Sequence, residues 1–160
     1  MDKKEIKLAY NIYSDVSEMK TDDAELLREA KEALKSSYSP YSDFPVGAAV
    51  KLANGKIIRG SNQENSAYPS GLCAERIALF AAGSQYPGVA IESIAIAISS
   101  PHTEAAISPC GACRQVMLEY EDKYKQNMRV IMHGENNSIM EISRVADLLP
   151  FGFTNQKLKK

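Results

Sequence analysis

All three cysteines of the 160-residue chain lie in two short segments, Cys73-Ala74-Glu75-Arg76 and Ser108-Pro109-Cys110-Gly111-Ala112-Cys113. A Cys-x-x-Cys pair can supply two corners of a tetrahedral zinc site, and Cys73 can supply a third. No obvious fourth protein ligand accompanies them. Three protein ligands with one open position are typical of catalytic zinc, whereas structural zinc sites usually have four. The spacing therefore predicts a catalytic zinc (Zn2+) centre held by Cys73, Cys110 and Cys113.

Two charged residues follow the first of these cysteines. Glu75 comes two residues after Cys73, so its carboxylate can reach the open position without binding the metal. A carboxylate beside a zinc-activated water can move protons during a hydrolysis. Three thiolates around a divalent ion leave an excess of negative charge, and we expect Arg76 to offset part of it, with Arg114 as a second candidate. If both cysteine segments begin helices, the helix dipoles also favour the thiolates.

A simpler interpretation is that Cys73 is a core residue and that Cys110 and Cys113 form a chance or redox pair. A redox Cys-x-x-Cys normally follows a strand in a thioredoxin-like βαβ unit and needs no Cys-x-Glu upstream. In zinc deaminases, by contrast, a ligand-x-Glu segment precedes Pro-Cys-x-x-Cys, and the Glu is the acid and base. The zinc interpretation is therefore favoured.

Composition limits the other classes of function. The chain is 44% hydrophobic and 24% charged, with a net charge of −1 and a length that suits one domain. It has no dense basic stripe, which argues against nucleic acid as a partner. No apolar run approaches the roughly 20 residues needed to cross a bilayer, and the start does not resemble a signal peptide. An odd number of cysteines favours a reducing compartment, so we expect a cytoplasmic protein.

Hydrophobic periodicity predicts an α/β domain with helices on both faces of one sheet. The Asn54-Gly55 pair indicates a tight hairpin. Asp22 with Glu25 resembles a capping box, and Ser143 is a candidate cap for a short helix. Residues 5–13 alternate as a strand, although the same residues also fit one face of a helix. The expected strands are 5–13, 46–53, 56–61, 89–98, 128–133 and 138–142, and the expected helices are 22–38, 73–82, 110–125 and 145–148.

Beyond the two cysteine segments, residues 41–49, 60–69 and 147–150 complete a set of blocks that resembles the cytidine deaminase family, in its small homotetrameric form with three cysteines. The blocks occur in the order and spacing of that family and anchor residues 24–153. The resemblance implies a three-layer α-β-α sandwich with a mixed five-stranded sheet. It divides the chain into an N-terminal extension (1–21) that can add a strand, a deaminase domain (22–155) and a basic tail (156–160).

The resemblance also implies the reaction, which is hydrolytic deamination of free cytidine and 2'-deoxycytidine in pyrimidine salvage, with one Zn2+ per subunit. In the family a zinc-activated water attacks C4 of the cytosine ring and ammonia leaves. Glu75 would take the water's proton, deliver it to N3 and help to protonate the amine. Asn62 and Glu64 match the family's ribose-binding residues, although composition alone favours a simple polar turn at this point.

Further contacts with the substrate follow from the same resemblance. Phe44 matches the aromatic that packs against the base, although a lone Phe is more often a core residue. The main chain at Ala74 and at Ser108 would read the polar edge of the pyrimidine. A C-terminal aromatic, Phe153 or else Phe151, would reach the site of a neighbouring subunit, which makes the homotetramer part of the function. His102 and His133 are interpreted as structural.

Three other functions are less well supported. A deaminase of a modified nucleoside such as blasticidin S need not keep a ribose-binding pair, so Asn62 and Glu64 argue against it. A nucleic-acid-editing deaminase would need a surface that holds backbone phosphates, which a near-neutral chain without insertions does not offer. A non-enzymatic zinc module would need a fourth ligand and no Glu75.

Overall fold

The computed structural model of the chain describes residues 1–100, 105–154 and 158. Within that part, one mixed sheet has the order β1-β6-β5-β4-β2-β3, and only β4 and β5 run parallel to each other. His102 and most of the predicted tail over 156–160 lie outside the described residues. The strands are β1 (Asn11–Tyr13), β2 (Val46–Leu52), β3 (Ile57–Ser61), β4 (Ile91–Ile98), β5 (Arg129–His133) and β6 (Ile139–Ile142).

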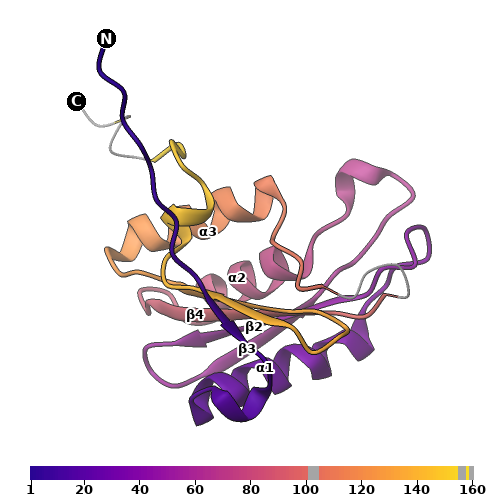
Figure 1. Cartoon of the computed structure of the whole chain (residues 1–160). Helices are drawn as coiled ribbons and strands as arrows, with labels where there is room; N and C mark the ends of the chain where they lie inside the picture. Colours follow the sequence, from indigo (N-terminus) through magenta and orange to yellow (C-terminus); the bar gives the residue numbers. More distant parts are fainter. Residues whose placement is uncertain (101–104, 155–157, 159–160) are drawn as a thin grey trace.

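Helices cover both faces of this sheet, as predicted (Figure 1). Helix α1 (Thr21–Ala33) packs on one face, and α2 (Ala74–Gln85) and α3 (Gly111–Tyr124) lie on the other. The central strand β4 is buried from both sides: Ile94 and Ile96 face α2 and α3, whereas Ala95 and Ala97 face α1. Among the described helices, none combines the length and the apolar character that a membrane span requires.

The sheet has six strands rather than the five expected, because the N-terminal extension contributes β1 at one edge. Asn11 pairs with Glu141 and Tyr13 with Ile139 on β6, and the Tyr13 hydroxyl donates to the Glu141 carboxylate. Of the strand predicted over 5–13, only the last three residues form one. Pairing begins at Asn11, opposite Glu141, although β6 continues by one residue to Ile142.

Both predicted helix caps are wrong, for the same reason. Lys20, not Asp22, precedes the first turn of α1, and the Asp22 carboxylate instead accepts a hydrogen bond from Lys51 on β2. The short 3-10 helix η4 (Val145–Leu148) begins without help from Ser143. Its first amides donate to the buried carboxylate of Glu121 on α3, which also accepts from the amide of residue 128. In each case a contact with a side chain from another element takes the place of the predicted local contact.

Candidate metal centre and pocket

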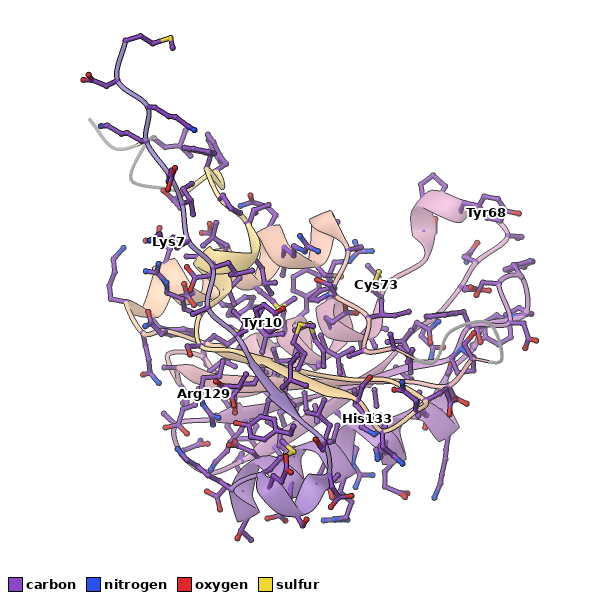
Figure 2. The ribbon with its side chains drawn as sticks, in the orientation of Figure 1. Lys7, Tyr10, Tyr68, Cys73, Arg129 and His133 are labelled. Atoms are coloured by element: carbon purple, nitrogen blue, oxygen red, sulfur yellow. The ribbon has the colours of Figure 1, made fainter. Side chains whose placement is uncertain are left out.

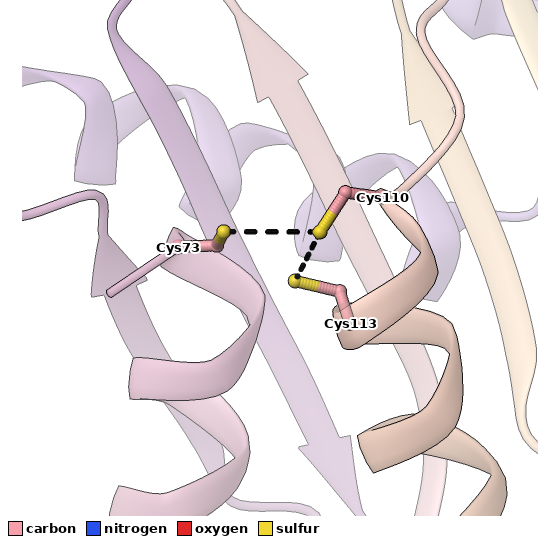
Figure 3. A group of neighbouring side chains, drawn as sticks. All are labelled: Cys73, Cys110 and Cys113. Carbon is pink, nitrogen blue, oxygen red and sulfur yellow. Dashed lines mark hydrogen bonds between the residues drawn. The ribbon is translucent and has the colours of Figure 1, made fainter. Parts of the chain in front are cut away.

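The three cysteines meet at the adjoining ends of α2 and α3 (Figure 3). Cys73 is the residue before α2, Cys110 is the residue before α3, and Cys113 lies in the first turn of α3. The Sγ atoms of Cys73 and Cys110 are 4.0 Å apart, and those of Cys110 and Cys113 are 3.5 Å apart. Tetrahedral zinc with Zn–S bonds of about 2.3 Å requires sulfurs roughly 3.8 Å from one another. The cluster therefore fits the ion that the sequence predicts.

The surroundings of Cys73 favour its thiolate. The Arg76 guanidinium donates to Cys73 Sγ at 3.5 Å. The pKa of the Cys73 thiol is lowered to about 5, because a hydrogen bond from the Cys113 thiol and the charge of Arg76 both stabilise its thiolate. The same hydrogen bond, together with burial, raises the pKa of Cys113. The amides at both helix N-termini add positive potential at the cluster.

Glu75 lies in the first turn of α2, where its side chain is only 5% exposed. Removal from water disfavours the charged carboxylate, so the pKa of Glu75 is raised. Glu75 lines the same pocket as Cys73 and Cys110. A carboxyl group with a raised pKa beside a metal position is suited to accept a proton and then donate it, which is what a general acid and base requires.

The pocket in front of the cysteines has a volume of about 720 Å³. Four of the residues predicted to bind substrate line it, namely Phe44, Asn62, Glu64 and Ser108, and so does Arg76, which was predicted to offset the charge of the thiolates. Ala74 and Phe153 are not among the lining residues: Ala74 is fully buried in α2, and Phe153 is 56% exposed at the C-terminal end. The role predicted for Ala74 would therefore require main-chain contacts, and the role predicted for Phe153 would require a neighbouring subunit.

Two tyrosines at the pocket were missed by the sequence analysis. Tyr41 and Tyr68 both line it, and their rings meet edge to face with centroids 6.0 Å apart. Figure 2 shows Tyr68 on the loop that projects from the domain beyond Cys73. Both residues belong to the matched blocks 41–49 and 60–69, so their place in those blocks was the available signal. His133, by contrast, is buried in β5, does not line the pocket, and has a pKa lowered by burial.

Asn62 uses its side chain to hold the segment that carries Phe44. Its Oδ1 accepts from the Val46 amide at 2.9 Å and from the Ser37 hydroxyl at 2.5 Å. Its Nδ2 donates to the Phe44 carbonyl at 2.9 Å, which leaves one N–H of the amide for another acceptor. Asn62 therefore positions Phe44 and still presents a donor next to it.

Glu64 binds the other end of the same segment. Its carboxylate accepts from the amides of Tyr41 at 2.8 Å and Ser42 at 3.2 Å, and from the Ser42 hydroxyl. These hydrogen bonds, chiefly that of the Ser42 hydroxyl, lower the pKa of Glu64, so it is negatively charged at neutral pH. A fixed carboxylate at this wall favours hydroxyl groups as ligands and repels phosphate.

A glycine on β3 sets how deeply α2 lies against the sheet. A Cβ on Gly60 would come within 2.5 Å of the Ala74 carbonyl and the Ala78 amide, both in the first turns of α2. We expect Gly60→Ala to push this end of α2 outward, which would displace Cys73 and Glu75. Overpacking of this kind typically costs about 1–3 kcal/mol, and the displaced ligand should also weaken zinc binding. Denaturant unfolding and zinc titration would measure the two effects.

Gly111→Ala provides a matched control next to another ligand. A Cβ at Gly111 would meet nothing within 4 Å. Because Gly111 opens α3, alanine should be neutral or slightly stabilising there. If the Gly60 variant were as stable and bound zinc as tightly as the Gly111 variant, the close approach of α2 would not position the centre.

Comparison with known proteins agrees with this arrangement. Residues 20–125 match the family model described as the cytidine and deoxycytidylate deaminase zinc-binding region. The chain is 41% identical over 133 residues to a cytidine deaminase of Halalkalibacterium halodurans, covering 83% of this chain and 95% of that protein. It is 42% identical over 134 residues to one of Sporosarcina psychrophila, covering 83% and 92%.

Solved structures give the same result. The crystal structure of cytidine deaminase from Burkholderia pseudomallei matches with a TM-score of 0.71 and 39% identity, over 81% of this chain and 97% of that one. The structure of cytidine deaminase from Mycobacterium tuberculosis matches with a TM-score of 0.65 and 31% identity, over 84% and 98%. With the sulfur cluster and the buried carboxyl in place, the chain belongs to the cytidine and deoxycytidylate deaminase family of zinc enzymes.

Proposed function

We propose that the protein hydrolyses free cytidine and 2'-deoxycytidine to the corresponding uridines and ammonia, as an enzyme of pyrimidine salvage. The observation that carries this proposal is the buried carboxyl of Glu75, which lines the same pocket as Cys73 and Cys110 of the three-sulfur cluster. A purely structural zinc site would be closed by a fourth ligand and would have no use for an adjacent carboxyl with a raised pKa.

When bound to the three thiolates, zinc would lower the pKa of a water molecule and so make it a nucleophile at neutral pH. Glu75 takes one proton from this water and delivers it to N3 of the cytosine ring while the oxygen–C4 bond forms. Glu75 then passes the second proton to the amino group, the C4–N bond breaks, and ammonia leaves. The carboxylate is regenerated at the end of the cycle. Its raised pKa suits both halves of this transfer.

Arg76 and the helix N-termini tune the centre rather than take part in proton transfer. Three thiolates would leave the site with a formal charge of −1 and weaken the polarisation of the water. The hydrogen bond from Arg76 to Cys73 Sγ withdraws electron density from one of the sulfurs. We assign Arg76 this role of partial neutralisation.

We propose that the pocket binds a nucleoside rather than a nucleotide or a strand. Phe44 would pack against the base, and the main chain at Ala74 and Ser108 would read its polar edge. The free N–H of Asn62 and the carboxylate of Glu64 would bind ribose hydroxyls. The charge of Glu64 disfavours a phosphate nearby, and a chain with a net charge of −1 does not attract a polyanion.

We also propose a cytoplasmic homotetramer with sites shared between subunits. Phe151 and Phe153 are both exposed in the protomer, as are the pocket residues Tyr41 and Tyr68. Large exposed aromatic side chains are typical of an interface. Phe153 would complete a neighbouring pocket. Light scattering coupled to gel filtration should give about four times the mass of one chain, and a monomer that remains fully active would contradict the shared site.

The reaction is tested by ultraviolet absorbance of four compounds with zinc-analysed protein: cytidine, 2'-deoxycytidine, free cytosine and blasticidin S. We expect the cytosine chromophore to be lost for the two nucleosides and kept for the free base. This pattern would support the metal, Glu75 and ribose assignments together. Turnover of blasticidin S alone would favour a modified nucleoside, and no turnover of any of the four at one zinc per chain would contradict the proposal.

A further inference from the structure

Arg114 is the residue after Cys113, and its charge suggested that it would offset the negative charge of the thiolates. Its guanidinium instead donates to neutral acceptors. Its Nε donates to the Pro109 carbonyl at 2.7 Å, its Nη2 to the Ser108 hydroxyl at 2.7 Å, and its Nη1 to the Leu148 carbonyl at 3.0 Å. All three acceptors are neutral, and two are main-chain carbonyls. Among the described residues, no carboxylate forms an ion pair with Arg114. The side chain therefore bridges segments of main chain.

One end of this bridge fixes the loop that enters the metal centre. The Pro109 carbonyl belongs to the peptide bond that joins Pro109 to Cys110, so a hydrogen bond to it sets the orientation of the peptide that carries a predicted ligand. Pro109 has no N–H of its own with which to anchor the loop. Ser108 and Pro109 both line the pocket. Arg114 thus holds this wall of the pocket by two hydrogen bonds.

The other end of the bridge holds the C-terminal segment. Leu148 ends η4, and its carbonyl accepts from Arg114. The next residue on α3, Gln115, donates from Nε2 to the Phe153 carbonyl at 2.8 Å. Two consecutive residues of α3 therefore grip the C-terminal segment at two carbonyls that are five residues apart in sequence. The start of α3 therefore connects the pocket loop, the metal ligands and the C-terminal segment.

We propose that Arg114 is a positioning residue: its guanidinium locks the Ser108–Pro109 loop of the pocket to the C-terminal segment, so that substrate affinity depends on a residue that does not touch substrate. The kinetic part of this proposal rests on the function proposed above. Three acceptors in three directions require the rigid planar fork of a guanidinium, whereas an ammonium group is a point donor on a flexible stem. Charge alone is therefore not sufficient, and lysine separates the two roles.

The test compares Arg114→Lys with Arg28→Lys. Arg28 lies on the exposed side of α1, where it pairs only with Glu25 and Glu29, so its replacement should leave activity unchanged. For Arg114→Lys we expect the KM for cytidine to rise at least about tenfold, with kcat within about threefold of the wild type and one zinc per chain. Arg114→Ala should show the same split with a larger rise in KM. A KM within twofold of the wild type in both variants, or a loss confined to kcat, would overturn the proposal.

Hydrogen exchange on the same zinc-loaded proteins provides a readout that does not depend on turnover. In Arg114→Lys we expect faster exchange at the amide of Cys110 and at residues 151–154, with no change in α1, and no difference anywhere in the pocket of Arg28→Lys. Exchange that is unchanged at both segments would overturn the positioning role. If the wild type failed to deaminate cytidine while exchange changed as expected, the function would be wrong and the positioning role would stand.

Discussion

Replacing Glu75 with glutamine is expected to lower kcat by about 10⁴-fold, the upper end of what one acid and base contributes, while the protein keeps one zinc per chain. Glutamine fills the same buried volume but cannot take a proton from water or deliver one to the ring. Because the folded protein raises the pKa of Glu75, this group lowers the stability of the zinc-free protein as the pH rises from its unfolded-state pKa to its folded-state pKa, and the loss is complete above the latter. After chelation, the glutamine variant should therefore unfold at a higher denaturant concentration than the wild type at pH 7, and this difference should shrink toward pH 4.

Turnover, zinc content and unfolding of the chelated proteins would be measured on the same preparations. Glu119→Gln on the exposed side of α3 is the matched control, and it should behave like the wild type in all three. A zinc-replete Glu75→Gln protein that keeps more than about a tenth of the wild-type rate would remove Glu75 from the proton-transfer steps.

Cys113→Ser is expected to lose zinc and stability together. Cys113 is fully buried between α2 and α3, and the hydroxyl of serine is a poor replacement for a thiolate ligand. A site that is saturated about 1,000-fold above its dissociation constant contributes about 4 kcal/mol to folding. For a domain of this size that corresponds to a fall in Tm of roughly 8–16 °C. Calorimetry with metal analysis would measure both losses.

Chelation of the wild type provides the control for this variant. Removal of zinc should lower the Tm of the wild-type protein toward that of Cys113→Ser, whereas the chelator should leave the variant unchanged, because zinc binding and folding are coupled. A Cys113→Ser protein that retained stoichiometric zinc and wild-type stability would show that the Cys113 sulfur is not a zinc ligand.

The parts of the fold that sequence could predict depend on short-range patterns. Asn54 and Gly55 determine the β2–β3 hairpin locally, and Gly55 adopts the positive φ of 81° that its turn requires. The continuous apolar run of β4 predicts a strand covered on both faces, and it is one. The cysteine spacing predicts a metal cluster, and such a cluster requires the starts of two helices to lie side by side. For the hairpin and for β4, the signal and the structure occupy the same stretch of chain, whereas the cysteine cluster joins two separate segments.

The parts that sequence could not predict depend on contacts between elements that are far apart in sequence. Glu121 takes the place of Ser143 as the cap of η4 from 24 residues away, and Arg114 reaches Leu148 across 34 residues. Only the last three residues of the alternating stretch 5–13 pair with β6, which the alternation itself does not indicate. Asn62 was predicted as a ribose contact, and nothing in its neighbours in sequence indicates that it also clamps Phe44. Such contacts become visible only when the sheet has brought the segments together.

The placement of the cysteines at two separate helix starts has a consequence for the order of folding. Cys110 and Cys113 are three residues apart and can meet an ion in the unfolded chain, whereas Cys73 is 37 residues from Cys110. Closing a flexible loop of that length costs about 3 kcal/mol of chain entropy, and the loop contains both α2 and β4. We therefore expect the third bond to the metal to form only after α2 has docked beside α3. The ion therefore binds tightly only late in folding, to chains whose core has already assembled.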